Sequence, residues 1–276
     1  MHLHFPFTTT QVLWTLTFAA QLVLLVVLLG RDRIKRYPWF TASMTLFTLR
    51  LLAEVLLGGR MPVIVLQAIF IPLGVLMALV SLLVIVEMAR RAFGGAQRQT
   101  WMIGSLSALA IAGGVLAAWG PWPHPQDLAV DSGLALLRLL QFIAQKTDML
   151  VDLLTVELGL LVALFGSRFQ AGWRSHTQRI VIGLSTVSLG WLAIQATWQM
   201  IARNIHPHNQ AEYEHVMGLG TKLVSANKVI YVAVLVWWIA CLWRDELGTG
   251  LVTETLEAPA PEAEDAPAEN APQSEL

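Results

Sequence analysis

Seven runs of apolar residues occupy most of this 276-residue chain, and each is long enough to cross a lipid bilayer as a helix. An α-helix rises about 1.5 Å per residue, so roughly 20 residues cross the ~30 Å hydrocarbon layer. Only 13% of the residues are charged, whereas soluble domains carry about 25%. We therefore predict an all-α membrane protein, a seven-helix bundle with transmembrane spans over about residues 10–30, 38–57, 62–88, 101–119, 133–166, 180–202 and 216–243.

The basic residues between these spans predict the orientation of the bundle. The segments that follow the first, third, fifth and seventh spans hold eleven Lys and Arg residues, and the other connecting segments hold only Arg60 and Arg203. Because cytoplasmic loops are enriched in Lys and Arg, this imbalance places the N-terminus outside and the C-terminus in the cytoplasm. The expected location is a plasma membrane, such as a bacterial inner membrane.

The last 32 residues differ in composition from the rest of the chain. Residues 245–276 contain nine acidic residues, no Lys or Arg, and much Ala and Pro. Such a composition predicts a disordered cytoplasmic tail. Besides membrane lipids, we expect a cytoplasmic protein partner that contacts the basic loops and this acidic tail, and no nucleic acid.

Five polar residues share one face of the fifth predicted span. Their spacing of +3, +4, +3 and +4 keeps them within about 80° of one another on a helix. Carboxylates and an arginine are too costly to leave facing lipid, so this stripe is predicted to point into the bundle. The members of the stripe are Arg138, Gln141, Gln145, Asp148 and Asp152.

Other predicted spans carry polar residues that could complete a site with this stripe. Arg50 and Glu54, four residues apart in the second span, are expected to pair with each other or across to the stripe. Lys228 shares a face with Ser225 in the seventh span, and it is the expected partner of Asp148 or Asp152.

The sixth span adds Gln195 to this set. The second, fifth, sixth and seventh spans are thus predicted to line a polar cavity that opens to the outer half of the membrane. The structural alternative is that the charges pair only to fix how the helices pack, since breaking a buried pair costs several kcal/mol.

Two further patterns in the third span predict packing. Glu87, near its cytoplasmic end, is expected to meet Arg90 or Arg91. Small and polar residues repeat every seven positions and predict a seam that a neighbouring helix approaches closely. The seam consists of Gln67, Gly74 and Ser81.

The outer loop before the seventh span has potential metal ligands within ten residues. They are His206, His208, Glu212 and His215. Histidine and carboxylate ligands suit zinc, and such histidines also titrate near pH 6. The spacing matches no defined metal motif, and histidines in a solvated loop are common, so zinc stays an alternative and no cofactor is expected.

Lys228 lies in the seventh span of a chain predicted to be N-out, and in this it resembles the retinal-binding rhodopsins. That resemblance implies retinal on Lys228. Microbial rhodopsins usually carry an aspartate four residues earlier, where this chain has Val224, and their acid-rich third helix is also missing. The resemblance is limited to topology and Lys228, so the chain is assigned to no family.

No motif of a soluble enzyme is present in the sequence. It lacks a Walker loop, Gly-x-Ser-x-Gly and His-Glu-x-x-His, so catalysis is not expected. The leading hypothesis is a receptor-like protein that senses a small polar ligand or a proton in its intramembrane cavity. A transporter or channel subunit, with the charges coupling or selecting ions, is the first alternative. An accessory subunit of a membrane complex is the second.

Overall fold

Seven α-helices account for nearly all of the residues that the structure, a computed structural model, describes. These residues are 9–58, 60–93, 98–119, 122, 133–165, 175–204 and 209–244. The helices are α1 (Thr9–Gly30), α2 (Pro38–Leu57), α3 (Val63–Ala92), α4 (Arg98–Ala118), α5 (Gly133–Phe165), α6 (His176–Asn204) and α7 (Gln210–Trp243). The prediction of an all-helical bundle is confirmed for the described part of the chain. The predicted acidic tail, 245–276, lies outside it.

Five of these helices are long and apolar enough to cross a membrane, namely α1, α2, α3, α6 and α7. The apolar stretch of α4, Ile103–Ala118, is shorter. Helix α5 is 33 residues long but carries five charged residues. It is not one of the helices that are apolar enough to cross a membrane. The polar stripe thus lies on the long helix that is least suited to lipid on all sides.

Several helices begin earlier than the apolar runs do. Helix α6 begins at His176 and α7 at Gln210, whereas the apolar runs start near residues 180 and 216. The first turn of α7 is explained by an N-cap at Asn209, which was not predicted. The Asn209 side-chain oxygen accepts the Glu212 backbone N–H at 2.8 Å, and the Asn209 side-chain amide donates to the Glu212 carboxylate at 3.2 Å.

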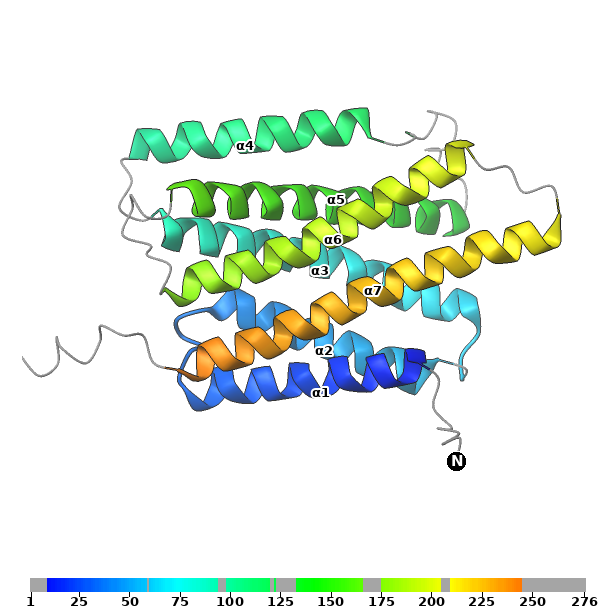
Figure 1. Ribbon diagram of the computed structural model, residues 1–276, viewed down its shortest axis with the longest axis horizontal. Coiled ribbons are helices and arrows are strands. Elements are labelled where there is room, and N and C mark those ends of the chain that lie inside the picture. The colour runs from blue at the N-terminus through cyan, green and yellow to red at the C-terminus, as the bar shows by residue number, and fades with distance from the viewer. Residues whose placement is uncertain are drawn as a thin grey trace, which may run out of the picture. The chain divides into compact units, whose positions relative to one another are not determined.

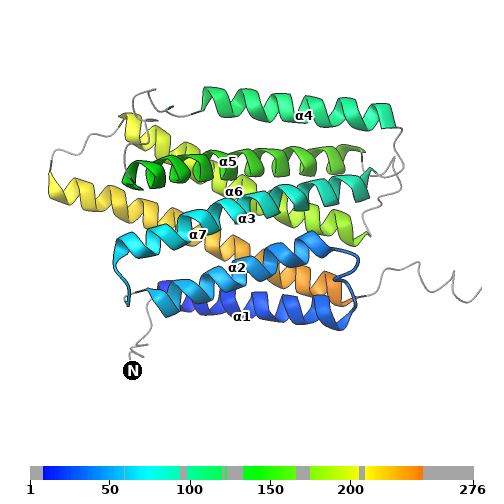
Figure 2. The same cartoon turned by 180° about the vertical axis from the view of Figure 1, so that it is seen from behind.

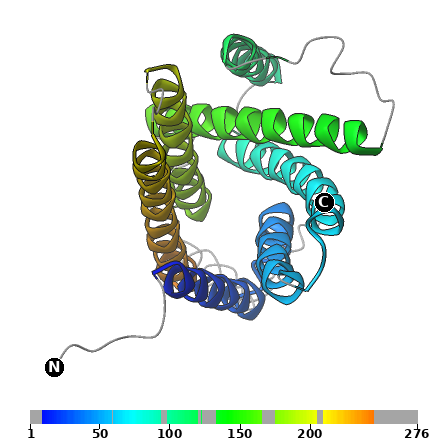
Figure 3. The same cartoon turned by 90° about the vertical axis from the view of Figure 1, so that its right-hand side faces the viewer.

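Six helices form a closed ring around the bundle axis (Figure 3). In ring order they are α1, α2, α3, α5, α6 and α7, and α7 packs back against α1. Figure 2 shows α3 between α2 and α5. Within the described residues α4 packs against α5 alone, outside the ring.

The chain reverses direction from each helix to the next (Figure 1). The ends of α1, α3 and α7 therefore lie together, and the Arg33 guanidinium donates to the Arg244 carbonyl at 3.4 Å. We call this end of the bundle, marked by residues 31–36, 90–91 and 244, the basic end. The opposite end carries the α2–α3 turn and the start of α7.

The continuous apolar core lies in the half of the ring nearest the basic end. All six ring helices contribute to it, through residues within 24–28, 37–44, 84–92, 158–162, 180–181 and 234–242. Trp238 of α7 is fully buried there and packs edge-on against Phe40 at 5.3 Å between ring centroids. Its indole N–H donates to the Arg179 carbonyl at 3.2 Å. This core closes the ring at the basic end.

Close packing and buried polar bonds join the helices around this core. The Trp238 indole lies directly on Gly183 of α6, where a Cβ atom would overlap it. Tyr37 and Thr177, both buried, share a hydrogen bond of 3.1 Å between their hydroxyl oxygens. The ring is therefore fixed by specific contacts as well as by apolar burial.

Helix α4 is attached to α5 through a lysine. The Lys146 ammonium donates to the Trp119 carbonyl at 2.8 Å, which satisfies a backbone acceptor at the end of α4. It also lies 4.6 Å from the ring centroid of Trp122, a cation–π contact. Lys146 is on a different face of α5 from the polar stripe, so α5 can contact α4 while the stripe faces the interior of the ring.

Candidate ligand cavity

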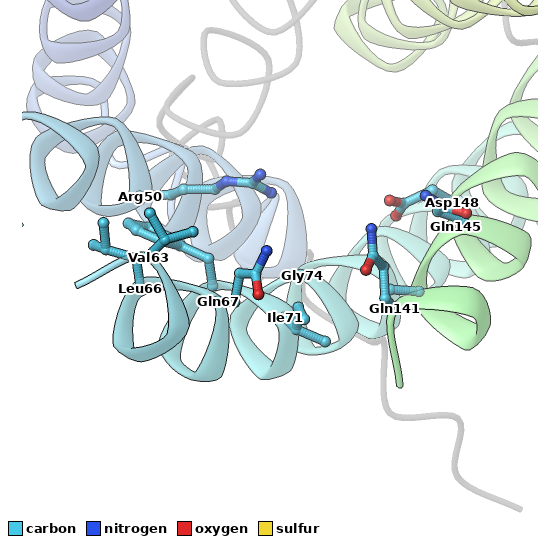
Figure 4. Close-up of a pocket in the computed structure, with 11 residues that line it drawn as sticks. Arg50, Val63, Leu66, Gln67, Ile71, Gly74, Gln141, Gln145 and Asp148 are labelled. Atoms are coloured by element: carbon cyan, nitrogen blue, oxygen red, sulfur yellow. The ribbon is translucent and has the colours of Figure 1, made fainter. Parts of the chain in front are cut away.

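A cavity of about 330 Å³ lies in the half of the ring farthest from the basic end. Three helices line it: α2 through Arg50, α3 through its first half, and α5 through the polar stripe (Figure 4). Its lining residues are Arg50, Val63, Leu66, Gln67, Phe70, Ile71, Gly74, Gln141, Ala144, Gln145 and Asp148.

Arg50 forms the α2 wall of the cavity. Its Nε donates to the Glu54 carboxylate at 3.1 Å, and a terminal nitrogen contacts the Met77 sulfur at 3.7 Å. The expected pairing of Arg50 with Glu54 is confirmed. A guanidinium has five N–H donors, so these two contacts leave further donors for the cavity.

The polar part of the α5 wall consists of Gln141, Gln145 and Asp148, three members of the predicted stripe. All three side chains are exposed in the bundle and directed toward the cavity. In Figure 4 they face the Arg50 guanidinium from the opposite side, and the Gln67 amide of α3 lies between the two walls. The prediction that the stripe points into the bundle holds for these residues.

The two charges of the cavity attract each other without forming a direct ion pair. Asp148 interacts electrostatically with Arg50, but within the described residues the only ion-pair partner of Arg50 is Glu54. A cation and a carboxylate therefore face one space from two helices, and the space between them is open.

Asp152 lies one turn farther along α5 toward the basic end. The buried Ser188 of α6 interacts with its carboxylate. Asp152 does not line the cavity, and neither does Arg138, which is exposed near the start of α5. The stripe thus divides into a cavity-lining middle part and two flanking residues.

The predicted role of α7 in this site is wrong. Helix α6 lies between α5 and α7, and α5 and α7 make no packing contact in the described residues. Lys228 is exposed and forms no ion pair with Asp148 or Asp152 there. The Ser225 hydroxyl donates to the Thr221 carbonyl of its own helix at 2.8 Å. Helical spacing shows which residues share a face, but it does not show which helix that face meets.

The sixth helix also lies outside the cavity wall. Gln195 is half-buried on α6 and is not among the lining residues. The wall that was predicted to come from α6 and α7 is instead supplied by α3. Its residues Gln67 and Gly74 were expected to form a close-packed seam, but a Cβ atom at Gly74 would meet nothing within 4 Å. Gly74 faces open space because it lines the cavity.

The proposed metal ligands divide between described and undescribed parts of the chain. His206 and His208 lie outside the described residues. The Glu212 carboxylate accepts a hydrogen bond from the side-chain amide of Asn209, the N-cap of α7, and His215 is exposed on the same helix. Over the described ranges no group of three or more His, Cys, Asp or Glu side chains is placed to hold a metal ion.

No protein-family model matches the chain, and no curated protein or solved structure is significantly similar to it.

Proposed function

We propose that this protein spans a plasma membrane seven times, with its N-terminus outside, and binds a small polar or charged solute in the cavity between α2, α3 and α5. The solute enters from the outer side, and the bundle acts as a receptor-like sensor of it. In this orientation the basic end faces the cytoplasm.

The observation that carries this proposal is the asymmetry of the ring. Six helices share a continuous apolar core at the basic end, while the polar cavity lies in the opposite half. A site that is open at one end and closed at the other suits recognition of a solute from one side. Its volume of about 330 Å³ is at the lower end of the range for small-molecule pockets.

Transport is the second candidate, and one contact favours it. Beyond the cavity, toward the basic end, Asp152 of α5 interacts with the buried Ser188 of α6. A carrier needs polar residues beyond its binding site, along the path that its solute takes to the other side of the membrane. The odd number of helices and the lack of an internal sequence repeat favour the sensor, because many carriers are built from repeats.

Labelling with a thiol reagent tests the proposal without knowledge of the ligand. Cys241 is the single cysteine, so Cys241→Ser gives a cysteine-free background into which Gln141→Cys places one thiol in the cavity. A membrane-impermeant maleimide added to intact cells should modify this thiol, because thiolates form in water and not in lipid.

The matched control is Leu109→Cys in the same background. Leu109 is 52% exposed on α4, outside the ring, and it should face lipid and stay unmodified. Equal labelling of both positions, or of neither, would contradict a water-filled cavity. Labelling of Gln141→Cys only after the cells are opened would contradict the outward orientation.

Uptake into proteoliposomes distinguishes the sensor from the carrier. A sensor binds its solute with no flux. Saturable uptake of radiolabelled L-alanine that is lost in Asp152→Asn, while the variant stays folded, would establish the carrier instead. An accessory subunit predicts neither binding nor flux, but a partner retained at fixed stoichiometry after mild detergent extraction.

A further inference from the structure

The chemistry of the cavity also indicates what kind of solute it takes, an inference that rests on the proposed function. Its two charged side chains have opposite signs and come from different helices, Arg50 from α2 and Asp148 from α5. They face the same space without a direct ion pair. We propose that the ligand is a small zwitterion, with a carboxylate for Arg50 and an ammonium group for Asp148 on an apolar body.

Each charged wall offers hydrogen-bonding groups that match one charged end of a zwitterion. The Arg50 guanidinium keeps donors beyond those used by Glu54 and Met77, and guanidinium groups bind carboxylates through two parallel hydrogen bonds. On α5, the Asp148 carboxylate and the amide oxygens of Gln141 and Gln145 can accept from the three N–H donors of an ammonium group. The Gln67 side-chain amide, which lies between the walls, can donate to the ligand carboxylate or accept from the ligand ammonium group.

The net charge of the cavity favours a zwitterion over a simple ion. Arg50 and Asp148 together contribute no net charge to the lining. A cationic ligand would satisfy Asp148 but would bring a second positive charge near Arg50, and an anion would do the reverse near Asp148. Arg50 keeps Glu54 as a partner in each case, so the preference comes from the N–H donors that Arg50 has left for a ligand. A zwitterion places an opposite charge at both walls, whereas a singly charged ligand does so at only one.

The remaining lining provides a place for an apolar side chain. Val63, Leu66, Phe70 and Ile71 of α3 and Ala144 of α5 form the apolar part of the wall. A volume of about 330 Å³ is large enough for a molecule the size of an amino acid. The ligand class is therefore a small α-amino acid or a molecule of the same charge pattern.

A set of four probes on one carbon skeleton tests this inference with the purified full-length protein. L-leucine carries both charges, its methyl ester only the positive one, N-acetyl-L-leucine only the negative one, and N-acetyl-L-leucine amide neither. L-alanine serves as a smaller zwitterion. Isothermal titration should show binding of the two amino acids, and each singly charged analogue should bind at least about tenfold more weakly, since one charge-assisted contact is lost.

Variants locate the binding in the cavity. Gly74→Leu should fill the cavity and abolish binding, because nothing lies within 4 Å of its Cβ position. Gly104→Leu on α4, whose Cβ position is equally free, is the matched control and should bind as the wild type does. Asp148→Asn should weaken amino-acid binding but not the binding of the N-acetyl form.

Every outcome of this experiment is informative. Equal or tighter binding of the ester or of the N-acetyl form would overturn the zwitterion and establish a cation or anion site. If none of the five probes binds while Gln141→Cys is labelled from outside, the zwitterion inference fails and the proposed function stands. If Gln141→Cys is not labelled either, both fail.

Discussion

The Glu87 carboxylate of α3 accepts the backbone N–H of Phe40 at 3.1 Å, at the start of α2. The same oxygen accepts the N–H of Trp39, also at 3.1 Å. Tyr37, which precedes α2, makes no side-chain cap, so a carboxylate from a neighbouring helix satisfies the first N–H groups in its place. The contact combines capping with a negative charge at the positive end of the helix dipole.

Glu87→Gln should destabilise the bundle by about 1–3 kcal/mol, because it weakens both capping bonds and removes the ion pair with Arg91 at 3.4 Å. Glu87 is 8% exposed, so solvent replaces these bonds poorly. Glu54→Gln is the control. It removes an exposed ion pair, which contributes under about 1 kcal/mol. Equal losses in reversible unfolding from detergent micelles would contradict this account.

Gly183→Ala should be destabilising, by roughly 1–3 kcal/mol, because its Cβ would overlap the buried Trp238 indole. Gly74→Ala should be neutral or stabilising by up to about 1 kcal/mol, since its Cβ meets open space and alanine favours the helix. Unfolding curves of the two variants test the packing of α6 on α7. Similar losses of unfolding free energy at both positions would contradict the close contact between Gly183 and Trp238.

Tyr231→Phe should cost about 1–3 kcal/mol of unfolding free energy. The Gln21 amide donates to the Tyr231 hydroxyl at 2.8 Å, and Gln21 is 1% exposed, so the variant leaves a buried donor without its acceptor. Adding Gln21→Leu removes that donor. The double variant should therefore lose less unfolding free energy than the two single variants lose in sum. Additive losses would mean that α1 and α7 are not coupled through this bond.

Lys146→Met should weaken the packing of α4 on α5 by about 1–2 kcal/mol of free energy. The Lys146 ammonium group donates to the Trp119 carbonyl and contacts the Trp122 ring, and methionine can do neither. Hydrogen exchange over residues 112–118 should become faster, while the ring helices keep their protection. Lys222→Met, a change at an exposed lysine of α7, should leave the exchange of α4 unchanged. Equal acceleration in both variants would argue against the role of Lys146.

Much of the fold could be predicted from the sequence. Apolar runs predicted all seven helices, and the +3, +4 spacing of Gln141, Gln145 and Asp148 predicted that they share a face. Glu87 was expected to meet Arg90 or Arg91, and it pairs with Arg91. These features depend on residues that are close in the chain, where helical geometry fixes the relative positions.

The sequence did not predict which helices are neighbours. Lys228 was expected to pair with α5, yet α6 lies between α5 and α7, and α4 is outside the ring. Seven helices can be arranged in many ways that bury the same faces, and the order around the ring depends on contacts such as Trp238 on Gly183. The wall from Gln67 and Gly74 was missed for the same reason.

The most direct test of the central claim is the free energy of unfolding of Asp148→Asn, measured beside Glu87→Gln. If Asp148 serves a ligand, its charge has no direct ion pair to lose, because Arg50 pairs with Glu54. We predict that Asp148→Asn changes the unfolding free energy by less than about 1 kcal/mol, or stabilises the protein, while Glu87→Gln destabilises it. A loss at Asp148 as large as the loss at Glu87 would show that the stripe fixes helix packing, and it would contradict a binding site.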